Sequence, residues 1–175
     1  ATYTSSYTCT AGIIDFSVSS DGTRVYMLYA TEIQQFDLST PWDITSASLA
    51  TNGTFDISSE TIVATSLQLT TNDTTIYVHD SDATKKLNRY VMTTPKDITT
   101  IAYDISARFD NSNYTLSFTT NDGTNVIVRD NSNDTYRTFY FDANNIPYTI
   151  HTPGSAWTGD ITTSLVPMKK TFDST

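Results

Sequence analysis

Apolar and polar residues alternate along most of the chain, in short runs that turn-forming residues interrupt. The first such run, Ile14 to Tyr29, alternates on both sides of Asp21-Gly22. Alternation with a period of two predicts half-buried strands, and Asp-Gly between two such runs predicts a β-hairpin. A further strand is expected at Ile33 to Leu38. It precedes a turn at Pro41, because proline fixes φ and has no amide proton to donate to a ladder.

The same order of strands and turns recurs twice more. Leu67 to Val78 surrounds Asn72-Asp73, and Leu116 to Val128 surrounds Asp122-Gly123. A proline turn follows each hairpin, and the three prolines are 54 and 52 residues apart, which predicts a repeated unit of four short strands. The turn residues assigned to the copies are Asp21, Gly22, Pro41, Trp42 and Asp43, then Pro95 and Asp97, then Asp122, Gly123 and Pro147.

The predicted fold is all-β, with three degenerate four-stranded blade-like repeats and almost no helix, since no segment keeps an apolar period of 3.6 residues. A partial β-propeller and a threefold β-repeat both fit this description. The copies are expected at 14–49, 50–103 and 104–157, with a C-terminal strand or arm at 158–175, in one domain of 175 residues. The strands not yet mentioned are predicted at Thr61–Ala64, Ile101–Ile105 and Ile161–Val166.

Three units leave strand edges that a closed propeller of four to eight blades would pair. Two chains could form a six-bladed ring, three units could close as a trefoil or prism, or an open assembly could dock onto a larger partner. We therefore expect a homo-oligomer or a docked component.

The charge balance narrows the class of partner. The chain carries 10 basic and 19 acidic residues, for a net charge of −9, so nucleic acid and anionic membranes are poor partners. Cys9 is the one cysteine in the sequence, which excludes an internally disulfide-stapled module. The sequence has no apolar run long enough to span a bilayer and no basic, apolar leader, so we expect folding in a reducing cytosol.

No motif in the sequence reaches the level of an active site, and we expect no catalytic residue, no metal and no cofactor. His79 and His151 lie in different copies, and Asp130 to Asp134 is best interpreted as a polar turn, because the later glycine and glutamate of a calcium loop are missing. Trp42 and Trp157 are the candidate interface or sugar-stacking aromatics, since exposed aromatic rings serve both purposes.

Two segments carry a resemblance to a known repeat. Ser20 to Tyr26 and Phe36 to Ser48 resemble a repeat of predicted structural proteins of marine bacteriophages and environmental bacteria, usually taken as propeller-like blades. The second copy departs from the pattern at Lys96, where the first has Trp42, and the third loses most of the Pro-Trp-Asp core.

The resemblance implies a non-enzymatic virion accessory protein that decorates the head or tail of a phage particle through contacts with capsid or tail proteins. Its location would be the virion, assembled in the host cytoplasm. The alternative is a lectin-like module that closes a propeller by oligomerising and binds host surface glycans. A bacterial surface or matrix protein with the same repeat is a third interpretation.

Overall fold

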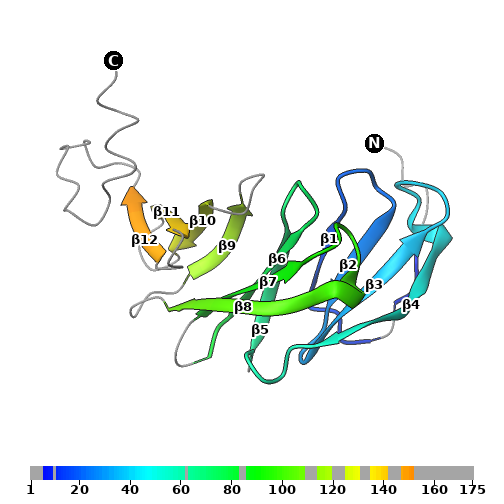
Figure 1. The fold of residues 1–175 in the computed structure, drawn as a ribbon, viewed down its shortest axis with the longest axis horizontal. Helices are drawn as coiled ribbons and strands as arrows, with labels where there is room; N and C mark the ends of the chain where they lie inside the picture. The colour runs from blue at the N-terminus through cyan, green and yellow to red at the C-terminus, as the bar shows by residue number, and fades with distance from the viewer. Residues whose placement is uncertain are drawn as a thin grey trace, which may run out of the picture.

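The computed structural model describes residues 6–9, 11–61, 63–82 and 86–108, and the backbone of four later strands, 114–119, 125–130, 135–141 and 147–151. These residues form three four-stranded antiparallel sheets (Figure 1). The first sheet contains β1 (Asp15–Val18), β2 (Arg24–Leu28), β3 (Glu32–Leu38) and β4 (Ala47–Asp56). The second contains β5 (Ala64–Leu69), β6 (Thr75–Asp80), β7 (Lys86–Met92) and β8 (Ile101–Arg108). The third contains β9 (Tyr114–Thr119), β10 (Asn125–Asp130), β11 (Thr135–Phe141) and β12 (Pro147–His151).

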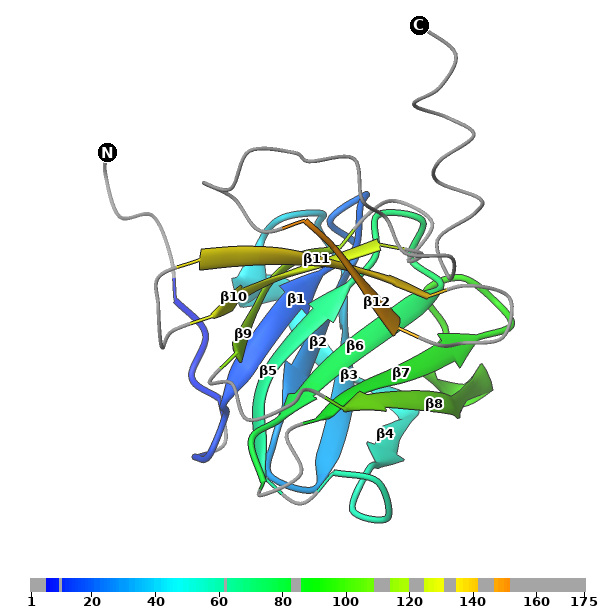
Figure 2. The same ribbon diagram turned by 90° about the vertical axis from the view of Figure 1, so that its left-hand side faces the viewer.

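Each sheet is a simple meander in which consecutive strands are hydrogen-bonded neighbours. The sheets meet along their first strands, since β1 contacts β5 and β5 contacts β9, and Figure 2 shows these three strands near one another. The helical content of the described residues is limited to two single 3₁₀ turns, η1 (Ile44–Ser46) and η2 (Ile98–Thr100). The prediction of an all-β chain is therefore confirmed for the part of the chain that the structure describes.

The structure differs from the sequence-based boundaries in two places. The strand predicted at Thr61–Ala64 is wrong, because β4 ends at Asp56 and β5 begins only at Ala64. The predicted limits between copies, after residues 49 and 103, fall inside β4 and β8. In both units the fourth strand starts immediately after the 3₁₀ turn and pairs with the third strand, so each sheet ends later than the proline spacing suggested.

Pro147 also has a different environment from the other turn prolines. The sequence placed it in a turn, whereas it is the first residue of β12 and pairs with Phe141. Proline is compatible with the first residue of an outer strand, where its missing amide proton breaks no central ladder. Ile161–Val166, Trp157, Asp122 and Gly123 lie outside the described residues.

The main core lies between the first and second sheets. The first sheet contributes Tyr26, Leu28 and Ile33, which are all fully buried, from alternate positions of β2 and β3. The second sheet faces them with apolar residues from all four of its strands and from η2: Leu67, Leu69, Ile76, Val78, Tyr90, Met92, Ile98 and Ile101. This packing fixes the two sheets face to face, because a one-residue slip in either would replace apolar with polar side chains.

The hairpin tips of the two sheets have the same geometry from different residues. At the first tip the Gly22 amide donates to the Ser19 carbonyl at 2.9 Å, and Gly22 has a φ of +71°. At the second tip the Asp73 amide donates to the Thr70 carbonyl at 2.9 Å, and Asp73 has a φ of +57°. A β-turn followed by a residue in the left-handed region is a common hairpin connection. The Asn-Asp tip thus replaces the Asp-Gly tip without a change of path.

The Asp73 side chain explains why aspartate holds a position that favours glycine. Its carboxylate accepts hydrogen bonds from the Ser20 amide at 2.9 Å and from the Ser20 hydroxyl at 2.6 Å. These bonds join the tips of the first and second sheets. Aspartate tolerates the left-handed region better than most residues, so the bridge costs little backbone strain.

We predict that Asp73→Ala destabilises the protein more than Asp73→Gly, by about 1 kcal/mol. Both variants lose the two bonds to Ser20, but only alanine retains the cost of a side chain in the left-handed region. Urea unfolding followed by far-ultraviolet circular dichroism measures the difference. Equal stability of the two variants would show that the Asp73 backbone is not strained.

Candidate interaction surface

The first sheet carries a second apolar face, directed away from the second sheet. We call it the outer face and define it by Phe16, Val25, Met27, Phe36 and Leu38. Val25, Met27, Phe36 and Leu38 form a buried cluster that is separate from the main core. They alternate with inward-facing Tyr26 and Leu28 of β2 and Ile33 of β3, so this sheet is apolar on both sides.

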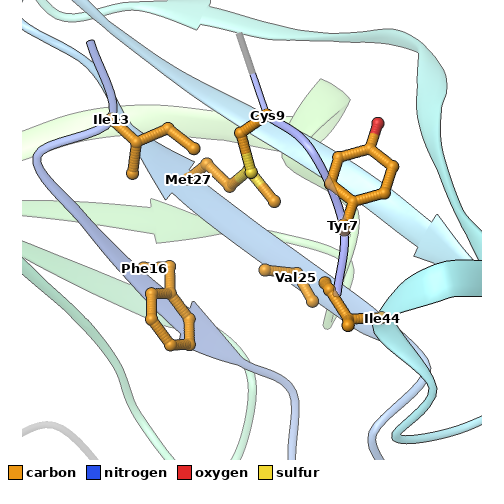
Figure 3. Close-up of a pocket in the computed structure, with 7 residues that line it drawn as sticks. All are labelled: Tyr7, Cys9, Ile13, Phe16, Val25, Met27 and Ile44. Carbon is orange, nitrogen blue, oxygen red and sulfur yellow. The ribbon is translucent and has the colours of Figure 1, made fainter. Parts of the chain in front are cut away.

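The described residues of the N-terminal segment, 6–9 and 11–13, cover the middle of the outer face. Tyr7, Cys9 and Ile13 pack against the cluster, and the Tyr7 ring meets Phe36 edge to face at a centroid distance of 6.0 Å. The cover is incomplete, because a pocket of about 210 Å³ remains beneath the segment. Figure 3 shows its lining, which is Tyr7, Cys9, Ile13, Phe16, Val25, Met27 and Ile44. The pocket is open and its lining side chains are almost entirely apolar.

Large hydrophobic side chains remain exposed around this pocket. Phe16 is 61% exposed, and it pairs across the ladder with buried Met27, which places both on the outer face. Leu49 is 53% exposed and pairs with Phe36 in the same way. Apolar side chains gathered on one face, rather than scattered singly, indicate a contact surface.

Trp42 lies in the turn between β3 and β4, two residues before Ile44 of the pocket lining. The Asp43 amide donates to the Thr40 carbonyl at 3.1 Å, so Thr40 to Asp43 is a β-turn with Pro41 and Trp42 at its centre. Trp42 has a φ of +64°, a conformation that favours glycine or asparagine. Its indole lies over Gly22, where an added Cβ would collide with the ring, yet Trp42 remains 67% exposed.

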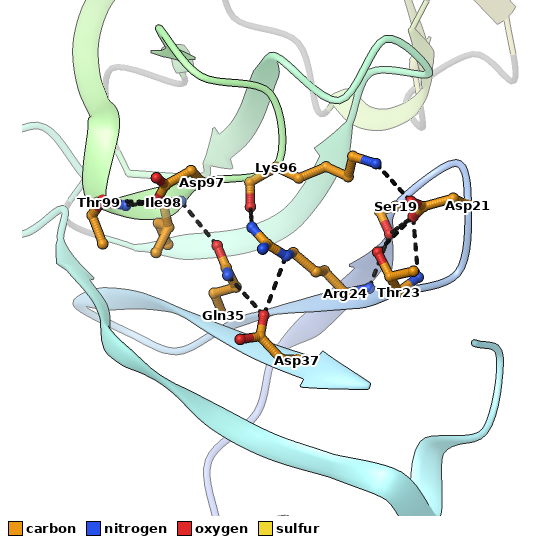
Figure 4. Close-up of polar contacts among 10 residues, drawn as sticks. All are labelled: Ser19, Asp21, Thr23, Arg24, Gln35, Asp37, Lys96, Asp97, Ile98 and Thr99. Carbon is orange, nitrogen blue, oxygen red and sulfur yellow. Dashed lines mark hydrogen bonds and ion pairs between the residues drawn. The ribbon is translucent and has the colours of Figure 1, made fainter. Parts of the chain in front are cut away.

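The matching turn of the second sheet has the same backbone and a different side chain. Lys96 has a φ of +67°, and its amide donates to the Asp73 carbonyl at 2.8 Å, as the Trp42 amide does to Gly22 at 2.8 Å. The Lys96 ammonium lies 2.6 Å from an Asp21 carboxylate oxygen of the first sheet (Figure 4). The half-buried Lys96 side chain thus contacts the neighbouring sheet.

Two further polar contacts join the same turn to the first sheet. The Arg24 guanidinium donates to the Lys96 carbonyl and also lies 3.2 Å from the Asp37 carboxylate. The Ile98 amide, at the start of η2, donates to the Gln35 side-chain carbonyl at 2.9 Å. Figure 4 shows these groups converging from both sheets. The turn before the fourth strand is therefore an element that docks one sheet onto the next.

Electrostatics reinforce this docking. The hydrogen bond from Lys96 and those from Thr23 hold the pKa of the Asp21 carboxyl well below its usual range. The Thr99 hydroxyl and amide likewise lower the pKa of Asp97, which caps η2. Both carboxylates therefore stay ionised in the folded protein under mildly acidic conditions.

The free edge of β5 is also satisfied by side chains of β1. The Leu67 amide donates to the Asp15 carboxylate at 2.8 Å, and the Leu69 amide donates to the Ser17 hydroxyl at 3.2 Å. An outer strand otherwise presents unpaired backbone groups that invite association with another chain. These contacts tie the first strands of the two sheets together.

The structure places the sequence-predicted residues as follows. Asp21 and Gly22 form a hairpin tip, and Pro41, Trp42 and Asp43 lie together beside it. Pro95 and Asp97 belong to the equivalent turn, which contacts the first sheet instead. The sequence analysis missed Phe16, Tyr7 and Ile13 as surface residues. Phe16 could have been singled out from the sequence, because it belongs to the alternating run that begins at Ile14. The sequence does not show which face of that strand another element covers.

The described residues contain no group of three or more His, Cys, Asp or Glu side chains arranged to hold a metal. His79 is buried, and its Nδ1 lies 2.8 Å from the Thr65 hydroxyl. Among the residues that the structure describes, no helix is long and apolar enough to cross a membrane.

Comparison with known proteins defines the class of fold. No protein-family model and no curated protein matches the chain. Among solved structures, a functionally unknown protein from Desulfotomaculum acetoxidans matches with a TM-score of 0.56 at 11% identity, over 82% of this chain and 40% of its own. The β-propeller domain of Cps50 (Swd1) from Myceliophteria thermophila matches with a TM-score of 0.51 at 9% identity, over 80% of this chain and 42% of its own.

A Bacteroides fragilis protein provisionally assigned as a 6-phosphogluconolactonase matches with a TM-score of 0.56 at 12% identity, over 77% of this chain and 36% of its own. The chain thus spans about two fifths of the length of these proteins. At such identities the likeness concerns the fold, which is all-β and propeller-like.

We predict that Lys96→Met lowers the free energy of unfolding at pH 7 by less than about 1 kcal/mol, because Asp21 is 41% exposed and solvent screens the pair. The pKa of Asp21 is depressed in the folded state, so this contribution is present above about pH 4 and is lost as the pH falls further. The difference between wild type and variant should therefore shrink on acidification. Denaturant unfolding between pH 2 and 7 tests this.

Lys86→Met is the matched control, because it removes the same charge from a residue outside the three ion pairs found in the described residues. Its stability difference from wild type should change little below pH 4. A difference for Lys96→Met that stays constant down to pH 2 would contradict the assigned pairing with Asp21.

We also predict that Gly22→Ala destabilises the protein by about 1–2 kcal/mol through its left-handed backbone and displaces the Trp42 indole. In a Trp42→Gly background only the backbone cost should remain. Unfolding free energies of the four-member cycle, with Trp42 fluorescence read in a Trp157→Phe background, measure both effects. Unchanged fluorescence in Gly22→Ala would contradict the contact between the indole and the hairpin tip.

Proposed function

We propose that the chain consists of three degenerate copies of one propeller blade and acts as a non-enzymatic structural protein through protein–protein contacts. The observation that carries this proposal is the outer face of the first sheet, where Phe16 and Leu49 are exposed on the side of an apolar pocket, with Trp42 exposed in the turn between β3 and β4. Interface cores are enriched in aromatic side chains and depleted in charge, and this surface has both properties.

The equivalence of the first two sheets supports the blade repeat. Gly22 and Asp73 match at the tips, and Trp42 and Lys96 match in the proline turns, each with a positive φ. The third sheet has the same meander order and lies beside β5 in the way that β5 lies beside β1. A set of such sheets around an axis is the arrangement of a propeller.

We further propose that the assembly in which the protein acts is a bacteriophage virion, where it decorates the head or tail. The support is the resemblance of Ser20 to Tyr26 and Phe36 to Ser48 to repeats of phage structural proteins. The net charge of −9 suits a solvent-facing accessory protein, since it keeps an exposed component soluble before it docks.

The experiment is a density-gradient separation of a lysate from the cells that produce the protein, probed with an antibody raised against it. We predict that the protein sediments with intact particles at a fixed ratio to the main structural protein. Recombinant wild type should rebind to particles stripped of it, and Phe16→Ser should rebind at least about tenfold more weakly. Recovery of the protein only in the soluble fraction would contradict a virion location.

Exposed Trp42 supports a second candidate, the lectin-like module, because an indole face stacks on sugar rings. Its equivalent in the second sheet is Lys96, so the aromatic is not repeated. A glycan array separates the candidates: binding that Trp42→Gly abolishes would favour the lectin. An assay with 6-phosphogluconolactone, prompted by the Bacteroides fragilis neighbour, should show no hydrolysis above the buffer rate.

A further inference from the structure

The contact between the first and second sheets provides a template for what the outer face binds. Val25 and Met27 of β2 hold the positions of Ile76 and Val78 of β6, counted from the matching tips. Phe36 pairs with Val25 as Tyr90 pairs with Ile76. In the second sheet these residues pack directly on the first sheet. The outer face therefore repeats the apolar pattern of a face that, one sheet later, receives a whole neighbouring sheet.

The outer face of the first sheet is less buried than the equivalent face of the second sheet. Phe16 holds the position of Leu67, yet Phe16 is 61% exposed and Leu67 is 4% exposed. Ile44 is only half-buried, whereas its equivalent Ile98 is 2% exposed. The N-terminal segment covers the centre of the face but leaves its rim and the pocket open. An apolar cavity of about 150 Å³ is large enough to take an aromatic ring, so this pocket has room for a partner's side chain.

The backbone polar groups of the turn between β3 and β4 can be compared with those of the equivalent turn between β7 and β8. The Ile98 amide and the Lys96 carbonyl are bound by Gln35 and Arg24 of the first sheet. The equivalent Ile44 amide and Trp42 carbonyl have no hydrogen-bond partner among the described residues. A sheet docked in the same way would supply an acceptor and a donor at these two points.

We propose that the outer face of the first sheet docks the third sheet of a second copy of this chain. Two copies related by a twofold axis would then close a ring of six sheets, within the four to eight blades of known propellers. The register supports this occupant, because Asn125 and Thr138 of the third sheet hold the positions of Arg24 and Gln35, and both are polar. The proposal rests on the proposed function, since it names a second copy as the protein that the outer face contacts. Particles would then bind the assembled pair, and Phe16→Ser would weaken their binding by dissociating that pair.

The test is the solution mass of the intact protein, measured by light scattering and sedimentation equilibrium from low to high micromolar concentration. We expect a dimer that dissociates on dilution. Phe16→Ser and Trp42→Gly should each raise the dissociation constant at least about tenfold, with circular dichroism and unfolding midpoint close to wild type. Val63→Ser is the matched control, because Val63 is 46% exposed and lies just before β5, outside the outer face of the first sheet.

Cross-linking of a mixture of isotopically light and heavy chains identifies the surfaces that meet. Light–heavy links should join residues 6–49 of one copy to residues 114–151 of the other. Links between two first sheets, or a monomer at every concentration, would overturn the proposal. A monomer that still binds particles would leave the proposed function intact, whereas a dimer absent from particles would support the docking and contradict the virion role.

Discussion

A sheet with two apolar faces is stable only when something covers both of them, and this constraint governs the structure. β2 is buried along nearly its whole length and β6 along all of it, so their residues alternate between two cores rather than between a core and water. Burial of an apolar side chain contributes about 1.5–3 kcal/mol, so each uncovered face carries a large cost. Sheets of this kind therefore stack in series, and the ends of the series need a partner or a cap.

Left-handed backbone recurs where one sheet meets the next. Trp42, Asp73 and Lys96 all have a positive φ, although glycine would adopt that conformation with less cost. Asp73 and Lys96 use their side chains to contact the first sheet. Trp42 has the same strained backbone, and its side chain is directed to the hairpin tip and to solvent. Trp42 keeps this costly backbone at the position equivalent to Lys96. This suggests that the Trp42 side chain also serves a contact, which is the physical reason to regard Trp42 as functional.

Several elements could be predicted from the sequence because their signals are local. The alternation around Asp21-Gly22 determined a hairpin, and the repeated Pro-x-Asp turn predicted where the third strand ends. The strand at Thr61–Ala64 was wrong because β-branched residues favour strands without requiring them, and Thr61 donates its amide to the Ile57 carbonyl in a turn after β4. The turn assigned to Pro147 failed for a related reason, since proline also fits the first position of an outer strand.

The sequence by itself determined the all-β class, the meander order within each sheet and the residues at the hairpin tips, because these depend on neighbours close along the chain. Only the tertiary structure decided which apolar stripe faces the second sheet and which remains half-covered. Both stripes of β2 carry large apolar residues in sequence, Tyr26 and Leu28 on one and Val25 and Met27 on the other. Their difference arises from contacts between groups more than 50 residues apart, such as Gln35 with Ile98 and Ser20 with Asp73, which no local pattern encodes.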